Sequence, residues 1–285
     1  MTAPAIGLRR APRRHRQRQY GIHIGLSLIA LVGLSPYLFA LSTSFKTNEQ
    51  FATSFWAPSF PLHFENFATA WTQIQPYMIT SITVAVIAIS CILVLSLLSG
   101  FVLARYSFPG RNFFFAVVIA LLMVPGIAGL IPLFIMMRDL GLLNTVWVLA
   151  IPHIAGGAVL GTVLMKTFIE GIPQETFDAA RIDGANGPRI FRSIVIPLSL
   201  PVVGTVSLLT IISIWNDFFW PLLTITKNEL KTVSVGLIFF QGQTGTEYGP
   251  MFAGYLLASL PLLLLFTFMS KYFLAGIQGG LPGSH

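Results

Sequence analysis

The chain has 285 residues, of which 54% are hydrophobic and only 9% are charged, and its mean hydropathy is +0.77. A soluble domain carries roughly 25% charged residues, and a soluble chain this apolar would expose large hydrophobic patches. The composition therefore excludes an ordinary soluble globular protein and predicts an integral membrane protein, in which apolar helix faces contact lipid.

The formal net charge of +7 is unevenly distributed along the chain. Six of the 17 basic residues lie within the first 18 positions, and the others flank apolar segments. This distribution indicates membrane topology rather than a nucleic-acid-binding face. We therefore expect residues 1–20 to form a basic cytoplasmic tail near anionic lipid headgroups, and we expect no nucleic-acid partner.

Six segments are long and apolar enough to cross a bilayer as helices, which requires about 20 residues each. They cover residues 22–41, 79–103, 113–136, 146–165, 198–220 and 252–269. The first is too long for the apolar region of a signal peptide, so we expect it to be retained. The sequence predicts an all-α membrane protein with one transmembrane domain over residues 21–280 and a C-terminal tail at 281–285. The apolar stretch at 233–240 is too short to span and is expected to form a partly buried helix or a re-entrant piece.

The basic residues also predict the orientation of the spans. With the N-terminus inside, 13 basic residues lie on the cytoplasmic side: the six of the tail, Arg105, Arg111, Lys166, Arg181, Arg189, Arg192 and Lys271. Only Lys46, Arg138, Lys227 and Lys231 then lie outside. The positive-inside rule therefore favours a multi-pass protein of the cell membrane with six spans and both termini in the cytoplasm.

Proline and glycine residues interrupt several of the predicted spans. They are Pro36 in the first span, Pro125, Gly126, Gly129 and Pro132 in the third, and Pro152, Gly156 and Gly157 in the fourth. Such residues are tolerated where neighbouring helices or a cavity satisfy the freed backbone groups, and small residues let helices pack closely. Two interpretations stay open: ordinary helix kinks, and a solute pathway or gate.

The cytoplasmic loop at about 170–197 carries the most informative local pattern. Pro173 suits a first helical turn, and Glu175 and Asp178 lie near the positive end of that helix. Asp183-Gly184 indicates a turn after it. By themselves, these features describe a docking element on the cytoplasmic surface of the membrane.

The same loop resembles a known motif. The run Asp178-Ala179-Ala180-Arg181-Ile182-Asp183-Gly184-Ala185, followed by Phe191, Ile194, Ile196-Pro197-Leu198 and Pro201, is similar to the EAA loop of ABC importer permeases. In that family the loop forms a coupling helix that inserts into a cleft of the cytosolic ATPase. The resemblance implies that the residues coupling this chain to an ATPase are Glu175, Asp178, Ala179, Ala180, Arg181, Asp183, Gly184 and Ala185. Asp178 stands where the family usually has glutamate, so the charge is kept on a shorter side chain.

Further motifs extend the resemblance over about residues 20–280. They are Ser44-Phe45-Lys46-Thr47, Trp215-Asn216-Asp217-Phe218 with Pro221-Leu222, Gly245-Thr246-Glu247-Tyr248-Gly249, and Tyr272-Phe273-Leu274-Ala275-Gly276-Ile277 with Gly279-Gly280. These segments look like those of MalG-like carbohydrate permeases. The resemblance implies a type I ABC importer permease fold and the import of a sugar or sugar-derived solute. It also implies three kinds of partner: an extracytoplasmic solute-binding protein, a second permease subunit in a heterodimer, and two ATP-binding subunits that hold ATP and Mg.

Catalysis is not expected on this chain. It has no phosphate-binding GxxxxGK[ST] motif, so we expect neither ATP hydrolysis nor a cofactor on it. Two alternatives to an ABC permease have sequence requirements of their own. A secondary transporter with ion coupling would require acids deep in the spans and inverted repeats. A membrane-embedded hydrolase would require a nucleophile with a partnered base. The sequence displays neither pattern.

Polar residues near the outer end of the fifth span are candidates for the solute pathway, because burying them in hydrocarbon is costly. They are Asn216 and Asp217, with Trp215 beside them. Sugar recognition uses aromatic faces together with amide and carboxylate groups, which these residues supply. Helix capping or an interhelix hydrogen bond is the alternative interpretation of Asn216 and Asp217.

Other polar residues have weaker patterns. His153 has no second ligand at metal spacing nearby, and Cys91 is the single cysteine, so we expect no metal site and a packed or hydrogen-bonded histidine. Gln241, Gln243 and Glu247 lie in the last outer loop, where MalG-like subunits reach toward the docked binding protein. We expect these three residues either to contact that protein or to be solvated.

Overall fold

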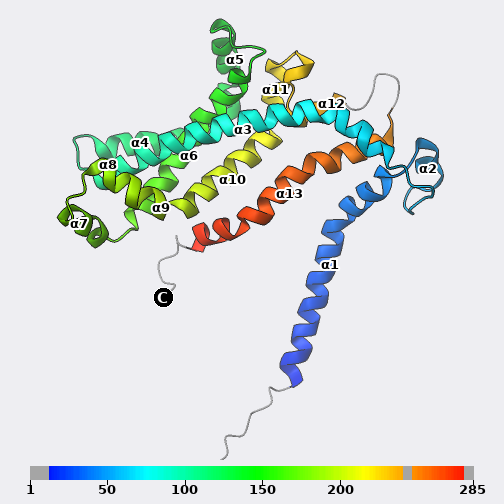
Figure 1. The fold of residues 1–285 in the computed structure, drawn as a ribbon, viewed down its shortest axis with the longest axis horizontal. Helices are drawn as coiled ribbons and strands as arrows, with labels where there is room; N and C mark the ends of the chain where they lie inside the picture. Colours follow the sequence, from blue (N-terminus) through cyan, green and yellow to red (C-terminus); the bar gives the residue numbers. More distant parts are fainter. Residues whose placement is uncertain (1–12, 240–245, 279–285) are drawn as a thin grey trace, which may run out of the picture.

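The computed structural model describes residues 13–239 and 246–278, and these residues form helices joined by short loops (Figure 1). The helices in the first half are α1 (Arg13–Ser44), α2 (Asn48–Thr53), α3 (Glu65–Arg105), α4 (Arg111–Leu122), the 3₁₀ helix η1 (Gly126–Gly129) and α5 (Leu130–Asp139). Those in the second half are α6 (Val146–Glu170), α7 (Gln174–Ile182), α8 (Gly187–Ile190), the π-helical turn η2 (Phe191–Val195), α9 (Ile196–Leu198), α10 (Leu200–Asn216), α11 (Phe219–Thr224), η3 (Asn228–Leu230), α12 (Val233–Phe239) and α13 (Tyr248–Gln278). The all-α prediction is confirmed, and residues 233–239 of the short apolar stretch form α12.

Four helices are long and apolar enough to cross a membrane singly: residues 22–44 of α1, α3, α6, and α13 as far as Phe268. Two further spans exist only as bent pairs, α4 with residues 126–139 at 90°, and residues 187–198 with α10 at 68°. The predicted continuous third span at 113–136 is therefore broken. Pro125 causes the break, because proline disfavours helical backbone at the residue before it and donates no N–H to the turn behind it. The predicted fifth span also ends early, because the helix stops at Asn216 rather than Trp220.

The packing of α3 on α6 supports six crossings. A Cβ atom at Gly100 would lie 2.6 Å from Met165 Cβ, and one at Gly161 would lie 2.8 Å from Ser96 Cβ. A Cβ atom at Gly157 would overlap Ile92. The paired positions advance together along the two helices, so α3 and α6 are parallel. Two parallel spans need a return crossing between them, which makes the bent α4–α5 segment one span.

The two ends of this bundle differ in charge. Arg105, Arg111 and Lys166 lie at the end that carries α7, α8 and α9, whereas Lys46 lies near α2 at the opposite end of α3 (Figure 1). Applied to this arrangement, the positive-inside rule predicts that the α7 end faces the cytoplasm and the α2 end faces outward.

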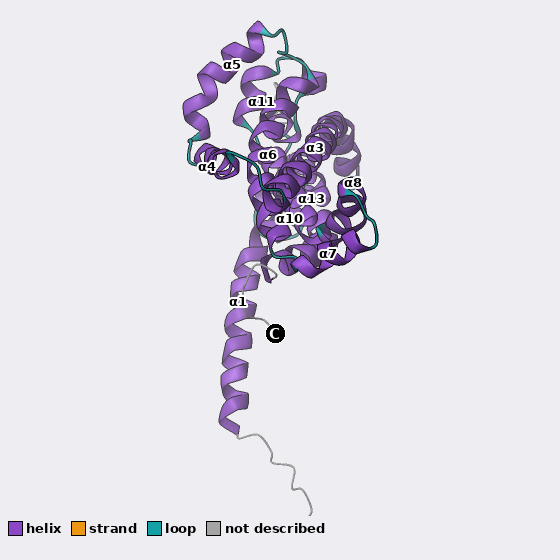
Figure 2. Cartoon of the chain, turned by 90° about the vertical axis from the view of Figure 1, so that its left-hand side faces the viewer, coloured by secondary structure: helices purple, strands orange, loops and turns teal. Residues whose placement is uncertain are grey.

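Helix α1 stands apart from the other spans (Figures 1 and 2). None of its most apolar window is buried within the chain. It meets the bundle at its outer end, where the rings of Phe39 and Phe252 are 5.5 Å apart. Beside this junction, Lys46 is 1% exposed, and its Nζ donates hydrogen bonds to the carbonyls of Ser54 at 2.7 Å and Phe55 at 3.1 Å. Burial lowers the pKa of Lys46.

Asn144 joins two outer loops, and its substitution gives a first prediction. Its backbone has φ of 59°, and its Oδ1 accepts hydrogen bonds from Thr226 N at 2.6 Å, Thr226 Oγ1 at 3.0 Å and Lys227 N at 3.1 Å. Asn144→Ala removes all three bonds at an exposed site, so we expect a loss of about 1 kcal/mol of stability, measured as a lower unfolding temperature in detergent. Asn144→Asp keeps the acceptor and should lose less, and equal losses in the two variants would contradict this role.

Candidate functional site

The predicted coupling loop folds into a capped helix at the more basic end of the bundle. Helix α7 begins after Pro173 and carries Glu175 in its first turn. At its other end, Gly184 has φ of +79°, Gly184 N donates to Arg181 O at 3.0 Å, and Ala185 N donates to Ala180 O at 2.9 Å. This pair of bonds is the Schellman motif, which requires a left-handed residue and therefore favours glycine. The predicted Asp183-Gly184 turn is present, and it ends α7 after two and a half turns.

Helix α7 has one face against the bundle and one face in solvent. Phe177 is 2% exposed and belongs to the main hydrophobic core, and Ala180 and Ala185 are packed against that core. The other residues of the predicted coupling set are exposed: Glu175, Asp178, Ala179, Arg181, Asp183 and Gly184. Among them, Arg181 Nη1 donates to Asp178 Oδ1 at 3.2 Å, an exposed ion pair that contributes little stability.

The exposed face of α7 also contains an apolar residue that the predicted coupling set left out. Ile182 is 86% exposed, although it lies at the water-facing end of the bundle. A solvated isoleucine is common in itself, but this one lies beside charged residues on a helix whose other face is buried. The arrangement is that of a small surface able to bind a protein partner.

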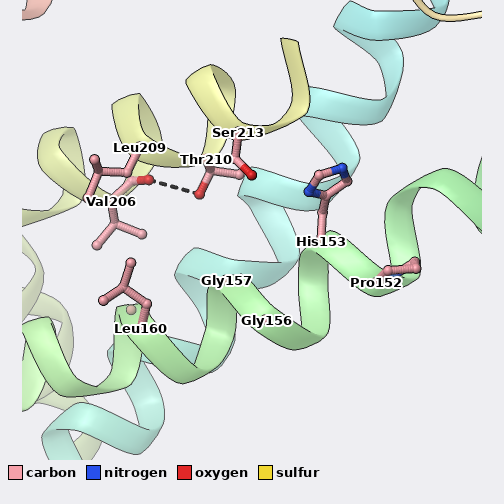
Figure 3. A pocket seen from close by; sticks show the side chains of 10 residues that line it. Pro152, His153, Gly156, Gly157, Leu160, Val206, Leu209, Thr210 and Ser213 are labelled. Carbon is pink, nitrogen blue, oxygen red and sulfur yellow. Dashed lines mark hydrogen bonds between the residues drawn. The ribbon is translucent and has the colours of Figure 1, made fainter. Parts of the chain in front are cut away.

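A second site lies between α6 and α10, where a cavity of about 350 Å³ opens beside the glycine-rich part of α6 (Figure 3). Its walls are Pro152, His153, Gly156, Gly157, Leu160 and Gly161 from α6, and Val206, Leu209, Thr210 and Ser213 from α10. The missing side chain of Gly156 contributes to this space, because a Cβ atom there would meet nothing within 4 Å, whereas Gly157 and Gly161 face α3. Hydroxyl and imidazole groups line one part of it, so it can offer hydrogen bonds to a polar solute within an otherwise apolar wall.

One polar pair lies beside this cavity, whose wall includes His153. His153 Nε2 donates a hydrogen bond to Asp217 Oδ2 at 3.0 Å, and the two side chains are 16% and 20% exposed. The same two residues line a second cavity of about 190 Å³, whose wall includes Gly126 and Leu130 at the break between α4 and α5. The His153–Asp217 pair therefore stands between the two cavities, at the junction of α6 with the end of α10.

The residues predicted at the end of the fifth span have different positions. Asp217 caps α11, since its Oδ1 accepts a hydrogen bond from Trp220 N at 3.3 Å. It also bonds to His153 of α6 and lines the smaller cavity, so it combines the capping, interhelix and cavity-lining roles. Asn216 is exposed and its Nδ2 donates to Ile212 O at 2.8 Å on its own helix. Trp215 is buried away from both cavities, and its Nε1 donates to Ala258 O of α13 at 3.2 Å. Trp215 thus packs helices together, whereas Asp217 reaches the cavity.

The residues predicted to contact the binding protein are only partly described. Gln241 and Gln243 fall outside the described residues. Glu247 is exposed just before α13, and the residues on either side of it are bonded to Asn48: Asn48 Nδ2 donates to Thr246 O and Tyr248 N donates to Asn48 Oδ1, both at 3.0 Å. Within residues 13–239 and 246–278, no three His, Cys, Asp or Glu side chains are grouped to hold a metal ion. The hydrogen-bonded histidine predicted at position 153 is present.

Comparisons with known proteins agree with one another. A family model described as "Binding-protein-dependent transport system inner membrane component" matches residues 96–278. The arabinooligosaccharides transport system permease protein AraQ of Halalkalibacterium halodurans is 32% identical over 91% of this chain and 95% of its own length. The probable ABC transporter permease protein YurM of Bacillus subtilis is 31% identical over 91% of this chain and 86% of its own length. A chain of a bacterial ABC transporter involved in importing the acidic polysaccharide alginate has the same fold, with a TM-score of 0.76 at 23% identity, over 93% of this chain and all of that one.

Proposed function

Because the chain belongs to the family of binding-protein-dependent transport system inner membrane components, and is a permease of an ABC importer, we propose that it passes a sugar or sugar-derived solute across the membrane. The cavity between α6 and α10 supports a polar solute, since it combines His153, Thr210 and Ser213 with an apolar wall. The sugar assignment draws its support from AraQ and from the alginate transporter.

The solute route in this proposal runs past the His153–Asp217 pair. Solute released by the extracytoplasmic binding protein enters from the α11 side, where Asn216 and Asp217 lie, and proceeds to the cavity of about 350 Å³. Gln241, Gln243 and Glu247 belong to the loop that we propose contacts the binding protein. Both termini are proposed to lie in the cytoplasm, in agreement with the distribution of basic residues.

The observation that carries the proposal is the two-faced α7. Its buried Phe177 attaches it to the spans, and its exposed face, with Glu175, Asp178 and Ile182, is free for a partner. We propose that this face docks on one of two ATP-binding subunits, which hold ATP and Mg. A second permease subunit docks on the other ATP-binding subunit. Closure of the ATP-binding subunits would then move α7 and open the spans alternately to each side.

The proposal is tested first at Ile182. Ile182→Asp places a charge in the proposed apolar contact without affecting the core, so we expect about tenfold weaker binding of the purified ATP-binding subunit, a change typical of losing one buried apolar side chain at an interface. The measurement is titration of that subunit onto the permease complex in detergent. Ile182→Leu is the matched control and should bind as the unchanged chain does. Equal binding by Ile182→Asp would show that α7 does not dock there.

The solute is tested in proteoliposomes containing the whole complex and its binding protein. We expect ATP hydrolysis to rise when the binding protein is loaded with an oligosaccharide, and labelled oligosaccharide to accumulate inside vesicles with the binding protein outside. Stimulation by amino acids or peptides instead of oligosaccharides would contradict the sugar assignment. Uptake by this chain alone, without ATP or partners, would contradict the whole proposal and support an ion-coupled transporter.

A further inference from the structure

The C-terminal residue of α3 makes an unusual set of contacts at the cytoplasmic end. Arg105 Nη2 donates hydrogen bonds to the carbonyls of Ile169 and Ile172, and Arg105 Nη1 donates to Gln174 Oε1 at 2.9 Å. Ile169 belongs to the last turn of α6, Ile172 to the turn that follows, and Gln174 is the first residue of α7. One guanidinium group therefore joins three helices.

Two kinds of group in this contact attract a cation. The last carbonyls of a helix have no partner within the helix and carry the negative end of its dipole, so a cation there both satisfies and stabilises them. The guanidinium also lies over the ring of Phe177, with Cζ 4.0 Å from the ring centre. A cation over an aromatic face is attracted to it, and Phe177 is the buried residue of α7. Arg105 thus contacts both the start and the buried face of α7.

Arginine suits this position better than lysine. Its planar group presents five donors in a fixed fork and stacks on aromatic rings, whereas the ammonium group of lysine is a compact charge. A lysine at position 105 could reach one or two of the carbonyls, but it could not hold them and Gln174 while covering the Phe177 ring.

The helices held by Arg105 form a rigid pair that extends to the cavity. Gly100 of α3 lies against Met165 of α6, and Ser99 and Thr162 share a hydrogen bond of 2.6 Å between their hydroxyl groups. Such close packing through small residues resists sliding of one helix on the other. At its outer part, α6 forms the glycine-lined wall of the cavity. If α7 is displaced and Arg105 moves with it, α3 and α6 move as well, and so does the cavity wall that α6 forms.

We propose that Arg105 is the positioning residue that couples α7 to the α3–α6 pair, so that movement of α7 moves the wall of the transport cavity. This inference rests on the proposed function, because it assumes that an ATP-binding subunit moves α7. Arg105 is not placed in contact with that subunit or with the solute. It acts through Ile169, Ile172, Gln174 and Phe177.

The test uses a reporter in the cavity wall. Cys91 is the only cysteine, so Cys91→Ser with Ser213→Cys gives one reactive thiol at an exposed position of the α6–α10 cavity. The complete complex is reconstituted with its ATP-binding subunits and labelled by a charged maleimide, without nucleotide and after trapping with ATP, Mg and vanadate. Since coupling between two sites typically changes an equilibrium about fivefold or more, we expect the labelling rate to change by at least about that factor on trapping.

Arg105→Ala should reduce the change in labelling rate on trapping to less than about twofold, because the variant lacks the contacts that couple α7 to the cavity wall. The ATP-binding subunits should still copurify with this variant and hydrolyse ATP. Arg105→Lys should respond to an intermediate degree. Arg111→Ala is the matched control. Arg111 lies on α4 at the same end of the bundle, and its Nη2 forms an ion pair with Glu170 Oε1 at 3.0 Å, but it makes none of the contacts described for Arg105. It should keep the full response.

Three results would overturn the inference. The first is a full response in Arg105→Ala, and the second is a loss of response in Arg111→Ala as large as that in Arg105→Ala, which would indicate general loosening of this end. If Arg105→Ala fails to assemble, Arg105→Lys is measured in its place. The third result that would overturn the inference is a full labelling response in Arg105→Lys. Failure of the unsubstituted complex to bind ATP-binding subunits at all would instead overturn the proposed function, so the two failures are distinguishable.

Discussion

Gly100→Ala is expected to destabilise the packing of α3 on α6 strongly. The new Cβ would lie 2.6 Å from Met165 Cβ and 3.0 Å from the backbone nitrogen of Lys166. Backbone atoms cannot rotate away, so α3 and α6 must separate, and the Ser99–Thr162 hydrogen bond between them would lengthen. Overfilling a close-packed contact costs about 1–3 kcal/mol, and we expect the upper part of that range because both neighbours are on the α6 main chain or next to it.

Gly156→Ala is the matched control for this substitution. Gly156 is also a span glycine and lies on α6, but a Cβ atom there meets nothing within 4 Å. We expect its stability to change by less than about 0.5 kcal/mol, because no contact is disturbed. The midpoint of unfolding in a titration with sodium dodecyl sulfate compares the two. Equal midpoints would mean that the helices are not packed through Gly100 as described.

Asp217→Ala should lower both stability and transport. It removes the hydrogen bond to His153 and the bond that caps α11, which together contribute about 2.5–4 kcal/mol if a charged hydrogen bond contributes about 1.5–3 and a cap about 1. It also frees His153 at the boundary between the two cavities. We expect solute uptake by the reconstituted complex to fall by at least about tenfold, the equivalent of 1.4 kcal/mol.

The control for this prediction is Asp217→Asn, measured by the same unfolding and uptake assays. An asparagine keeps an oxygen that can accept from His153 Nε2 or Trp220 N, so more than half of the lost stability should return. Asn216→Ala, one residue earlier, removes only a bond to Ile212 O on its own helix and should leave uptake within about twofold, as expected for an exposed side chain. If Asp217→Ala transports normally, the pair is only a structural link and the route past it is wrong.

Much of the fold follows from local sequence. A run of 20 or more apolar residues has few alternatives to a membrane helix, because every backbone group must be satisfied within the segment. The same holds for α7, where Pro173 and the Asp183-Gly184 turn mark the two ends of a short helix. Ser44-Phe45-Lys46-Thr47 is one of the motifs of the resemblance, and in the structure its Lys46 is a buried donor to two carbonyls.

The prediction was weaker where a helix bends. Pro125, Gly126 and Gly129 were identified as residues that loosen the third span, yet the sequence did not indicate a bend of 90°. Proline removes one hydrogen bond and disfavours one helical residue, but the size of the resulting bend depends on what surrounds the break. Here α4 and α5 continue in different directions on either side of it, and a cavity lies beside Gly126 and Leu130, between the break and His153 of α6.

The amino-acid sequence by itself determined the class of protein, most of the apolar spans and the two ends of the short helix α7, because each depends on composition or on residues close together in the chain. Tertiary structure alone decided that His153 meets Asp217, 64 residues away, and that Arg105 meets Ile169, Ile172 and Gln174. Such contacts depend on the register between helices. A shift of one residue turns a helical side chain by about 100° and moves it off the shared face, and nothing in the sequence near either residue specifies that register.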